Sequence, residues 1–210
     1  MVDLVRGLFL VLALGALPAL ANDVSVVKNT NDAPAEIAAP IKEHIAPGGV
    51  TAKVGANTIE LWFVKQLDAK GKDWSSVAEG TLVGAMKLTA PFRDIRGRTL
   101  KPGTFLLRFA LQPQNGDHLG VSPNREFLLA TPAAEDTAPA ALGHDPTVEL
   151  AAKSINISHP AVFSLEPAAP DAAPLSVTQN EAGHTFVIFE VPTAQGPFKF
   201  GLILVGHIEA

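Results

Sequence analysis

The segment between residues 112 and 125 contains the densest group of side chains that could bind a ligand. Asp117 and His118 stand next to each other on a loop flanked by Gly116 and Gly120. A carboxylate beside an imidazole can bind a small ligand or a metal, and glycine lets the backbone approach closely. Arg125 adds a cation that suits an anionic group. The same loop also fits a long turn in which Asp117 caps backbone amides and His118 is solvated. If the chain has a ligand site, we predict Asp117, His118 and Arg125 for it.

A second arrangement depends on how two C-terminal strands pair. Residues 184–191 and 198–209 are both strand-like, and a hairpin that places Val191 opposite Phe198 also places His184 opposite Val205. His207 is then the diagonal neighbour of His184 on the same face, where the two imidazoles could bind zinc or copper. A register slip of one residue separates them, leaving two edge histidines that bind nothing.

Two further groups have both a functional and a structural interpretation. The first is a charge cluster made of Arg93, Asp94, Arg96 and Arg98. It could hold a carboxylate or phosphate, although a salt-bridged, solvated turn is the usual outcome for such clusters. The second is the pair of tryptophans, Trp62 and Trp74, which could stack on sugar rings or simply pack in the core.

Several kinds of chemistry are absent from the sequence. There is no cysteine, which excludes disulfides, thiolate zinc sites, c-type haem attachment, blue copper and iron–sulfur clusters. The motifs of serine hydrolases, zinc proteases, P-loop nucleotide-binding proteins and dinucleotide-binding proteins are missing too. The net charge of −5 is spread along the chain, which gives no reason to expect nucleic acid or anionic lipid as a partner. These absences favour a non-catalytic protein.

Residues 1–21 have the pattern of an export signal. A short segment with Arg6 precedes ten apolar residues, and Ala19-Leu20-Ala21 fits a cleavage site. The apolar run is about half as long as a membrane-spanning helix requires, so we expect cleavage after Ala21 and no membrane contact afterwards. An exported chain without disulfides favours a bacterial periplasm or cell surface.

The elements that position these residues are predicted to be short strands. Strand-like segments lie at residues 50–54, 58–66, 81–88, 104–111, 126–130, 161–166, 175–179, 184–191 and 198–209. Proline and glycine separate these segments, and only residues 147–156 predict a helix of any length. The pattern favours an all-β, antiparallel β-sandwich of about eight or nine strands, with a β-barrel as the alternative.

The domain organisation follows from the same pattern. After the signal we expect an irregular N-terminal arm over residues 22–49, with one short strand, and then a single domain over residues 50–210. Within it, Arg108 falls on one strand face with Leu106 and Ala110, where it needs a partner or water. Trp62 shares a face with Glu60, which predicts a surface partly open to solvent or a ligand.

Some segments resemble a known group of proteins. They are Gly80-Thr81-Leu82-Val83-Gly84, Phe92-Arg93-Asp94-Ile95-Arg96-Gly97, Lys101-Pro102-Gly103-Thr104-Phe105 and Gly116-Asp117-His118. Together they resemble an uncharacterised family of secreted bacterial β-sandwich proteins. The resemblance implies an exported β fold and no particular activity, cofactor or catalytic residue.

We therefore predict an exported, non-catalytic module that binds a small ligand or a protein partner. One alternative is a periplasmic metal-binding protein that uses His184 and His207 for zinc or copper, in metal carriage or metal-assisted hydrolysis. The other is a carbohydrate-binding domain, which needs Trp62 or Trp74 exposed on a sheet face.

Overall fold

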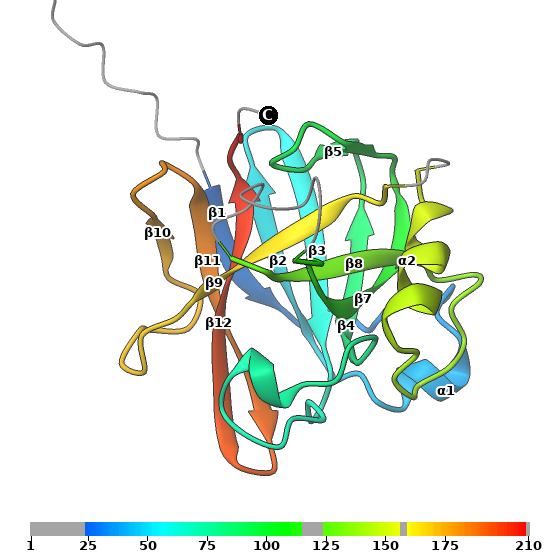
Figure 1. The fold of residues 1–210 in the computed structure, drawn as a ribbon. Helices are drawn as coiled ribbons and strands as arrows, with labels where there is room; N and C mark the ends of the chain where they lie inside the picture. Colours follow the sequence, from blue (N-terminus) through cyan, green and yellow to red (C-terminus); the bar gives the residue numbers. More distant parts are fainter. Residues whose placement is uncertain (1–23, 115–123, 156–158, 209–210) are drawn as a thin grey trace, which may run out of the picture.

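The computed structural model describes residues 24–114, 124–155 and 159–208, and these are mostly antiparallel β-strands (Figure 1). One sheet of ten strands has the order β1-β2-β3-β4-β7-β8-β9-β12-β11-β10. Its members are β1 Val24–Asn29, β2 Gly49–Val54, β3 Asn57–Phe63, β4 Leu82–Leu88, β7 Gly103–Leu111, β8 Glu126–Pro132, β9 Val162–Pro167, β10 Val177–Gln179, β11 Thr185–Thr193 and β12 Gly196–Val205. A separate hairpin pairs β5 Phe92–Arg93 with β6 Thr99–Leu100. The helical elements are α1 Ala39–Lys42, α2 His144–Ala152 and the single turn η1 Trp74–Ser76.

The long sheet curls until it is nearly closed. β1 and β10, at opposite ends of the strand order, lie in contact with each other. A twisted sheet of this length tends to curl or split, and closure hides the unpaired edges. The all-β, antiparallel prediction is confirmed. The expected strand count of eight or nine is too low, and one barrel-like sheet forms instead of the two packed sheets of a sandwich.

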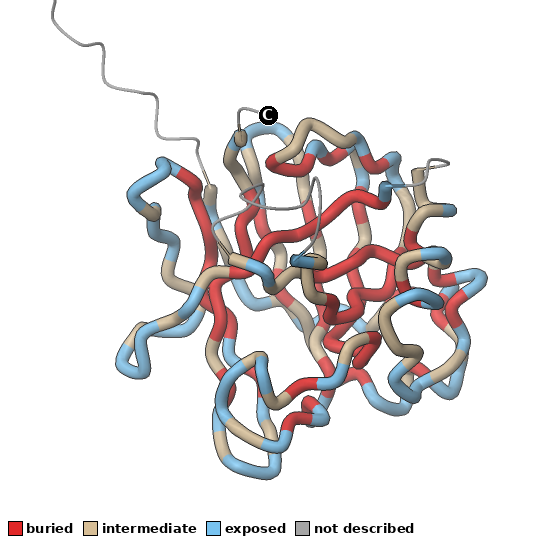
Figure 2. Tube along the Cα trace, in the orientation of Figure 1, coloured by how far each residue is buried: buried red, intermediate tan, exposed pale blue. Residues whose placement is uncertain are grey.

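Aromatic side chains fill the inside of the curved sheet. Rings from strands far apart in the sheet order meet there: Phe63 of β3 lies 4.8 Å from Phe189 of β11 and 5.8 Å from Phe200 of β12. Trp74 stacks on Phe109 of β7 with the ring centroids 4.7 Å apart. These contacts join strands across the inside of the curved sheet, many of whose residues are buried (red in Figure 2). Large rings thus occupy the space that closure creates.

A second layer covers part of the outer face of the sheet. The N-terminal segment crosses β3, where the backbone oxygen of Asn31 accepts a hydrogen bond of 2.9 Å from the Trp62 indole. Trp62 is therefore only 2% exposed, and the expected open face at Trp62 does not form. Further along, α2 packs on β7 and β8 (Figure 1). This layer explains why outward-facing strand residues are apolar.

Two predicted boundaries differ from the structure. The segment expected to be an irregular arm contains the predicted strand, here β1 Val24–Asn29, paired along its length with β2, and also α1. The helix expected at residues 147–156 begins earlier and is α2 His144–Ala152. Within the described ranges, no helix is long and apolar enough to span a lipid bilayer.

Candidate functional site

A pocket of about 280 Å³ lies between α2 and the outer face of β8 and β9. Its apolar wall comes from Phe127 and Leu129 of β8, Val162 of β9 and Val148 of α2. Residues two apart on a strand point to the same side, so Phe127 and Leu129 face α2 while the residue between them faces the core. The same side chains belong to a small apolar cluster with Ala151 of α2. Among the residues that the structure describes, the pocket is thus an unfilled part of the layer between helix and sheet.

A histidine paired with a carboxylate forms one polar wall. His144, the first residue of α2, lines the pocket, and its Nδ1 lies 2.5 Å from Oε2 of Glu79. The same carboxylate oxygen accepts a 3.0 Å hydrogen bond from the backbone N–H of Leu111, which fixes its position. A carboxylate at Nδ1 fixes the orientation of the ring. The pair therefore presents a fixed polar group at the pocket.

Arg96 is a second polar residue that lines the pocket. Its loop is held by Asp94, whose Oδ1 accepts from the backbone N–H groups of Arg96 and Arg98 at 3.0 and 2.7 Å. The other carboxylate oxygen, Oδ2, accepts from the backbone N–H of Val162 at 3.0 Å and so joins the loop to β9. Asp94 is 3% exposed, so this is a buried clamp and not a solvated turn.

The guanidinium of Arg96 uses few of its donors. Nη2 donates to the backbone oxygen of Pro160 at 2.7 Å and lies 3.6 Å from Oδ2 of Asp94. Nε is buried and has no hydrogen-bond partner within the described ranges. Burial lowers the pKa of Arg96, although the nearby Asp94 carboxylate opposes this effect. The group stays protonated, so the pocket wall carries a partly desolvated positive charge.

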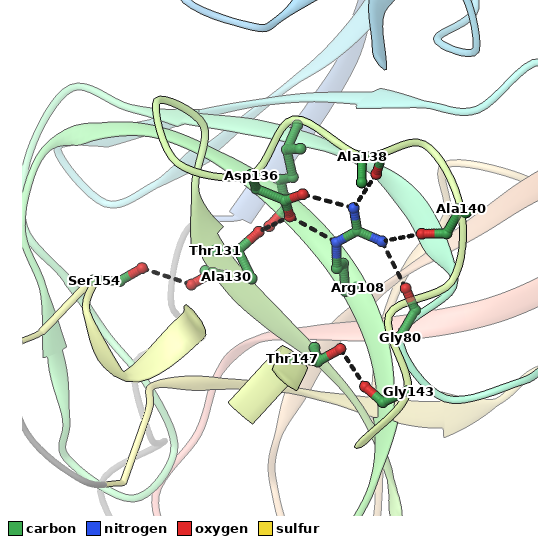
Figure 3. Close-up of polar contacts among 11 residues, drawn as sticks. Gly80, Arg108, Ala130, Thr131, Asp136, Ala138, Ala140, Gly143, Thr147 and Ser154 are labelled. Carbon is green, nitrogen blue, oxygen red and sulfur yellow. Dashed lines mark hydrogen bonds and ion pairs between the residues drawn. The ribbon is translucent and has the colours of Figure 1, made fainter. Parts of the chain in front are cut away.

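Arg108, in contrast to Arg96, uses all of its hydrogen-bond donors (Figure 3). Nε and Nη2 form a two-point contact with Asp136, both at 2.6 Å, and the remaining N–H groups donate to three backbone oxygens. These oxygens belong to Gly80, Ala138 and Ala140. Asp136 also accepts from the Thr131 hydroxyl at 2.5 Å. All five donors of this fully buried side chain are used, so Arg108 anchors the segment before α2 and has no donor left for a ligand.

The residues predicted for a ligand loop are only partly within the described ranges. Asp117 and His118 lie outside them. Arg125 is exposed, and its Nε and Nη2 donate to the backbone oxygen of Gln112 at 3.2 and 3.1 Å. Gln112 itself lines the α2 pocket. The role of Arg125 as an anion partner therefore stays a prediction. In the structure, its side chain holds the base of its loop through these hydrogen bonds.

The two C-terminal histidines are arranged differently from the expectation. Val191 does lie opposite Phe198, but a bulge between Thr185 and Phe186 shifts the register, so that Thr185 and not His184 faces Val205. His184 is 3% exposed, and its Nε2 lies 3.2 Å from the backbone oxygen of His207. The His207 side chain is exposed. Across the described ranges, no three or more His, Asp or Glu side chains are grouped as a metal site would require.

Sequence reasoning missed the α2 pocket. Glu79 and His144 are 65 positions apart, and neither belongs to a recognisable motif. In the sequence, Arg96 is only one member of a charge cluster. Patterning predicted the strands that build the wall, but no local signal shows that α2 leaves a gap above them.

Comparison with known proteins gives no relative: no family model, no curated protein and no solved structure matches this chain.

Proposed function

We propose that this protein is a non-catalytic binding module that takes a small, mostly apolar ligand into the α2 pocket. The observation that carries the proposal is an apolar cavity of about 280 Å³ with two fixed polar groups at its walls. Ligand pockets typically combine apolar walls with a few well-placed polar groups and start at about 300 Å³. This volume suits a ligand the size of a medium-chain amphiphile or a small aromatic compound.

Filling the pocket tests the proposal. Val148→Trp places a large side chain from α2 into the cavity, whereas Val27→Trp changes a valine that is 59% exposed on β1. We expect 1-octanol to raise the melting temperature of the wild type and of Val27→Trp, because a ligand that binds only the folded state stabilises it. Val148→Trp should lose that shift. An equal shift in Val148→Trp would place octanol elsewhere and contradict the proposal.

The alternatives have less support. Trp62 is buried and Trp74 stacks on Phe109, so a carbohydrate-binding face would have to rely on the exposed part of Trp74 alone. A metal site would require His184 to exchange its contact with the His207 backbone for a metal. Trp74 and His207 each line another pocket, of about 370 and 320 Å³, but polar and charged side chains such as Asp73 and Asp94 make up more of the lining there than in the α2 pocket.

We also propose export to a bacterial periplasm or cell surface, on the pattern of residues 1–21. Edman sequencing of the protein recovered from a periplasmic extract should begin at Asn22. Recovery of the uncleaved chain from the cytoplasm alone would argue against export.

A further inference from the structure

We propose that the ligand of the α2 pocket carries an anionic group, a carboxylate, sulfonate or phosphate, and that Arg96 is the residue that binds it. This inference rests on the proposed function and specifies the chemistry of its ligand. It concerns a residue that lines the pocket and is 30% exposed, so that a bound molecule can reach its side chain.

The first argument compares the two arginines on this side of the sheet. Arg108 donates five hydrogen bonds, two of which go to the carboxylate of Asp136 at 2.6 Å. The guanidinium of Arg96 donates one, to Pro160, and its Nε and Nη1 make none within the described ranges. A structural arginine uses its donors, as Arg108 does. Nε is buried, whereas Nη1 is not, so Nη1 is the unused donor in the pocket wall that an anion could reach.

The second argument concerns charge. Asp94 is the carboxylate next to Arg96, but the separation from Nη2 is 3.6 Å and its oxygens already accept three backbone N–H groups. Arg98 stands on the same loop and adds to the positive potential. Glu79, which holds the pocket residue His144, is engaged by that histidine and by a backbone amide. The positive charge of Arg96 is therefore incompletely balanced, and a partly buried cation attracts an anion more strongly than a solvated one.

The third argument is that Arg96 is held in place. Its backbone N–H is fixed by Asp94 and its Nη2 by Pro160, so binding would freeze little further side-chain motion. The apolar wall of Phe127, Leu129, Val148 and Val162 then accommodates the rest of the molecule. The arrangement fits an amphiphile with an anionic head and a short apolar body.

The experiment compares octanoate with 1-octanol, which share a chain and differ in charge. Affinities are measured by titration calorimetry on the wild type, Arg96→Gln, Arg98→Gln and Arg125→Gln. We expect wild type to bind octanoate about tenfold more tightly than octanol, the size expected of a hydrogen bond to a charged group. Arg96→Gln should lose that preference while retaining octanol binding. Arg98→Gln, on the same loop, and Arg125→Gln, the anion partner predicted from sequence, should keep it.

Each outcome decides one point. If the wild type binds neither compound, the proposed pocket function fails. If it binds both equally, the pocket stands and the anionic ligand is wrong. If the preference disappears in Arg125→Gln and persists in Arg96→Gln, the anion site is at Arg125. Should Arg96→Gln fail to fold, Arg96→Lys supplies the test, because it keeps the charge and should retain part of the preference.

Discussion

At the residue scale, the contrast between Arg108 and Arg96 separates a side chain that builds the fold from one that is free to bind. The alternation in β7 predicted that Arg108 would share a face with Leu106 and Ala110 and would need a partner. That partner, Asp136, lies in an alanine- and proline-rich segment without any pattern, 28 positions away. The need for a partner could be predicted from the sequence, whereas its identity follows only from the fold.

Removing Arg108 should be costly because it leaves a buried carboxylate without its counter-ion. We expect Arg108→Met to lower the free energy of unfolding by about 3–5 kcal/mol, as for other broken buried ion pairs. Arg125→Met, at an exposed position where only two hydrogen bonds to Gln112 are lost, should change it by about 1 kcal/mol or less. Urea unfolding followed by circular dichroism measures both.

A double variant distinguishes the charge effect from the packing effect. Arg108→Met with Asp136→Leu removes both charges, so its cost should be smaller than the sum of the two single variants. Additive costs would mean that Arg108 stabilises the fold mainly through its hydrogen bonds to three backbone oxygens, and not through its ion pair with Asp136.

At the element scale, α2 depends on how closely the chain before it approaches the sheet. Gly80 has φ +81°, and a Cβ there would lie 2.4 Å from the backbone nitrogen of Gly143, the residue that caps α2. The oxygen of Gly80 also accepts from Arg108 at 2.7 Å. The α2 pocket therefore depends on a contact that only glycine allows.

Gly80→Ala should consequently displace α2 as well as destabilise the fold. The control is Gly55→Ala, where φ is +57° and no atom lies within 4 Å of the added Cβ. Gly55→Ala should cost about 1–2 kcal/mol, the strain of the left-handed backbone alone. Gly80→Ala should cost more than that and weaken octanol binding in the α2 pocket. Equal costs with unchanged binding would show that the Gly80–Gly143 contact is easily relaxed.

Element boundaries show where local patterns suffice. Asp145 and Pro146 are typical residues of the first helical turn. The sequence therefore already indicates that α2 begins before residue 147. The bulge in the β11–β12 hairpin is not indicated, because nothing marks it in the unbroken apolar runs beside it, residues 186–189 and 202–205. The expected pairing of His184 with Val205 was therefore wrong by one residue, although the hairpin and its turn were predicted correctly.

At the scale of the whole molecule, composition and alternation predict antiparallel strands but not how the sheet closes. Closure depends on which strands lie at the ends, and one of them is β1, in the segment expected to be an arm. The same segment supplies Ile37, Ile41 and Ile45, which are at most 4% exposed. A spacing of four residues between isoleucines is typical of a helix, but the prolines in this segment argue against a helix.

The N-terminal segment should therefore be part of the folding unit. Burying an isoleucine contributes about 1.5–3 kcal/mol, so losing three approaches the total of about 5–15 kcal/mol that stabilises a typical domain. Deleting residues 22–49 also removes β1 and uncovers Trp62, whose indole is bonded to Asn31. We expect residues 22–210 to melt cooperatively and residues 50–210 to lack a cooperative transition by calorimetry. Adding a peptide of residues 22–49 should restore it. If residues 50–210 melt within a few degrees of the longer chain, residues 22–49 are not required for folding. The sheet would then be stable with β2 as its edge strand.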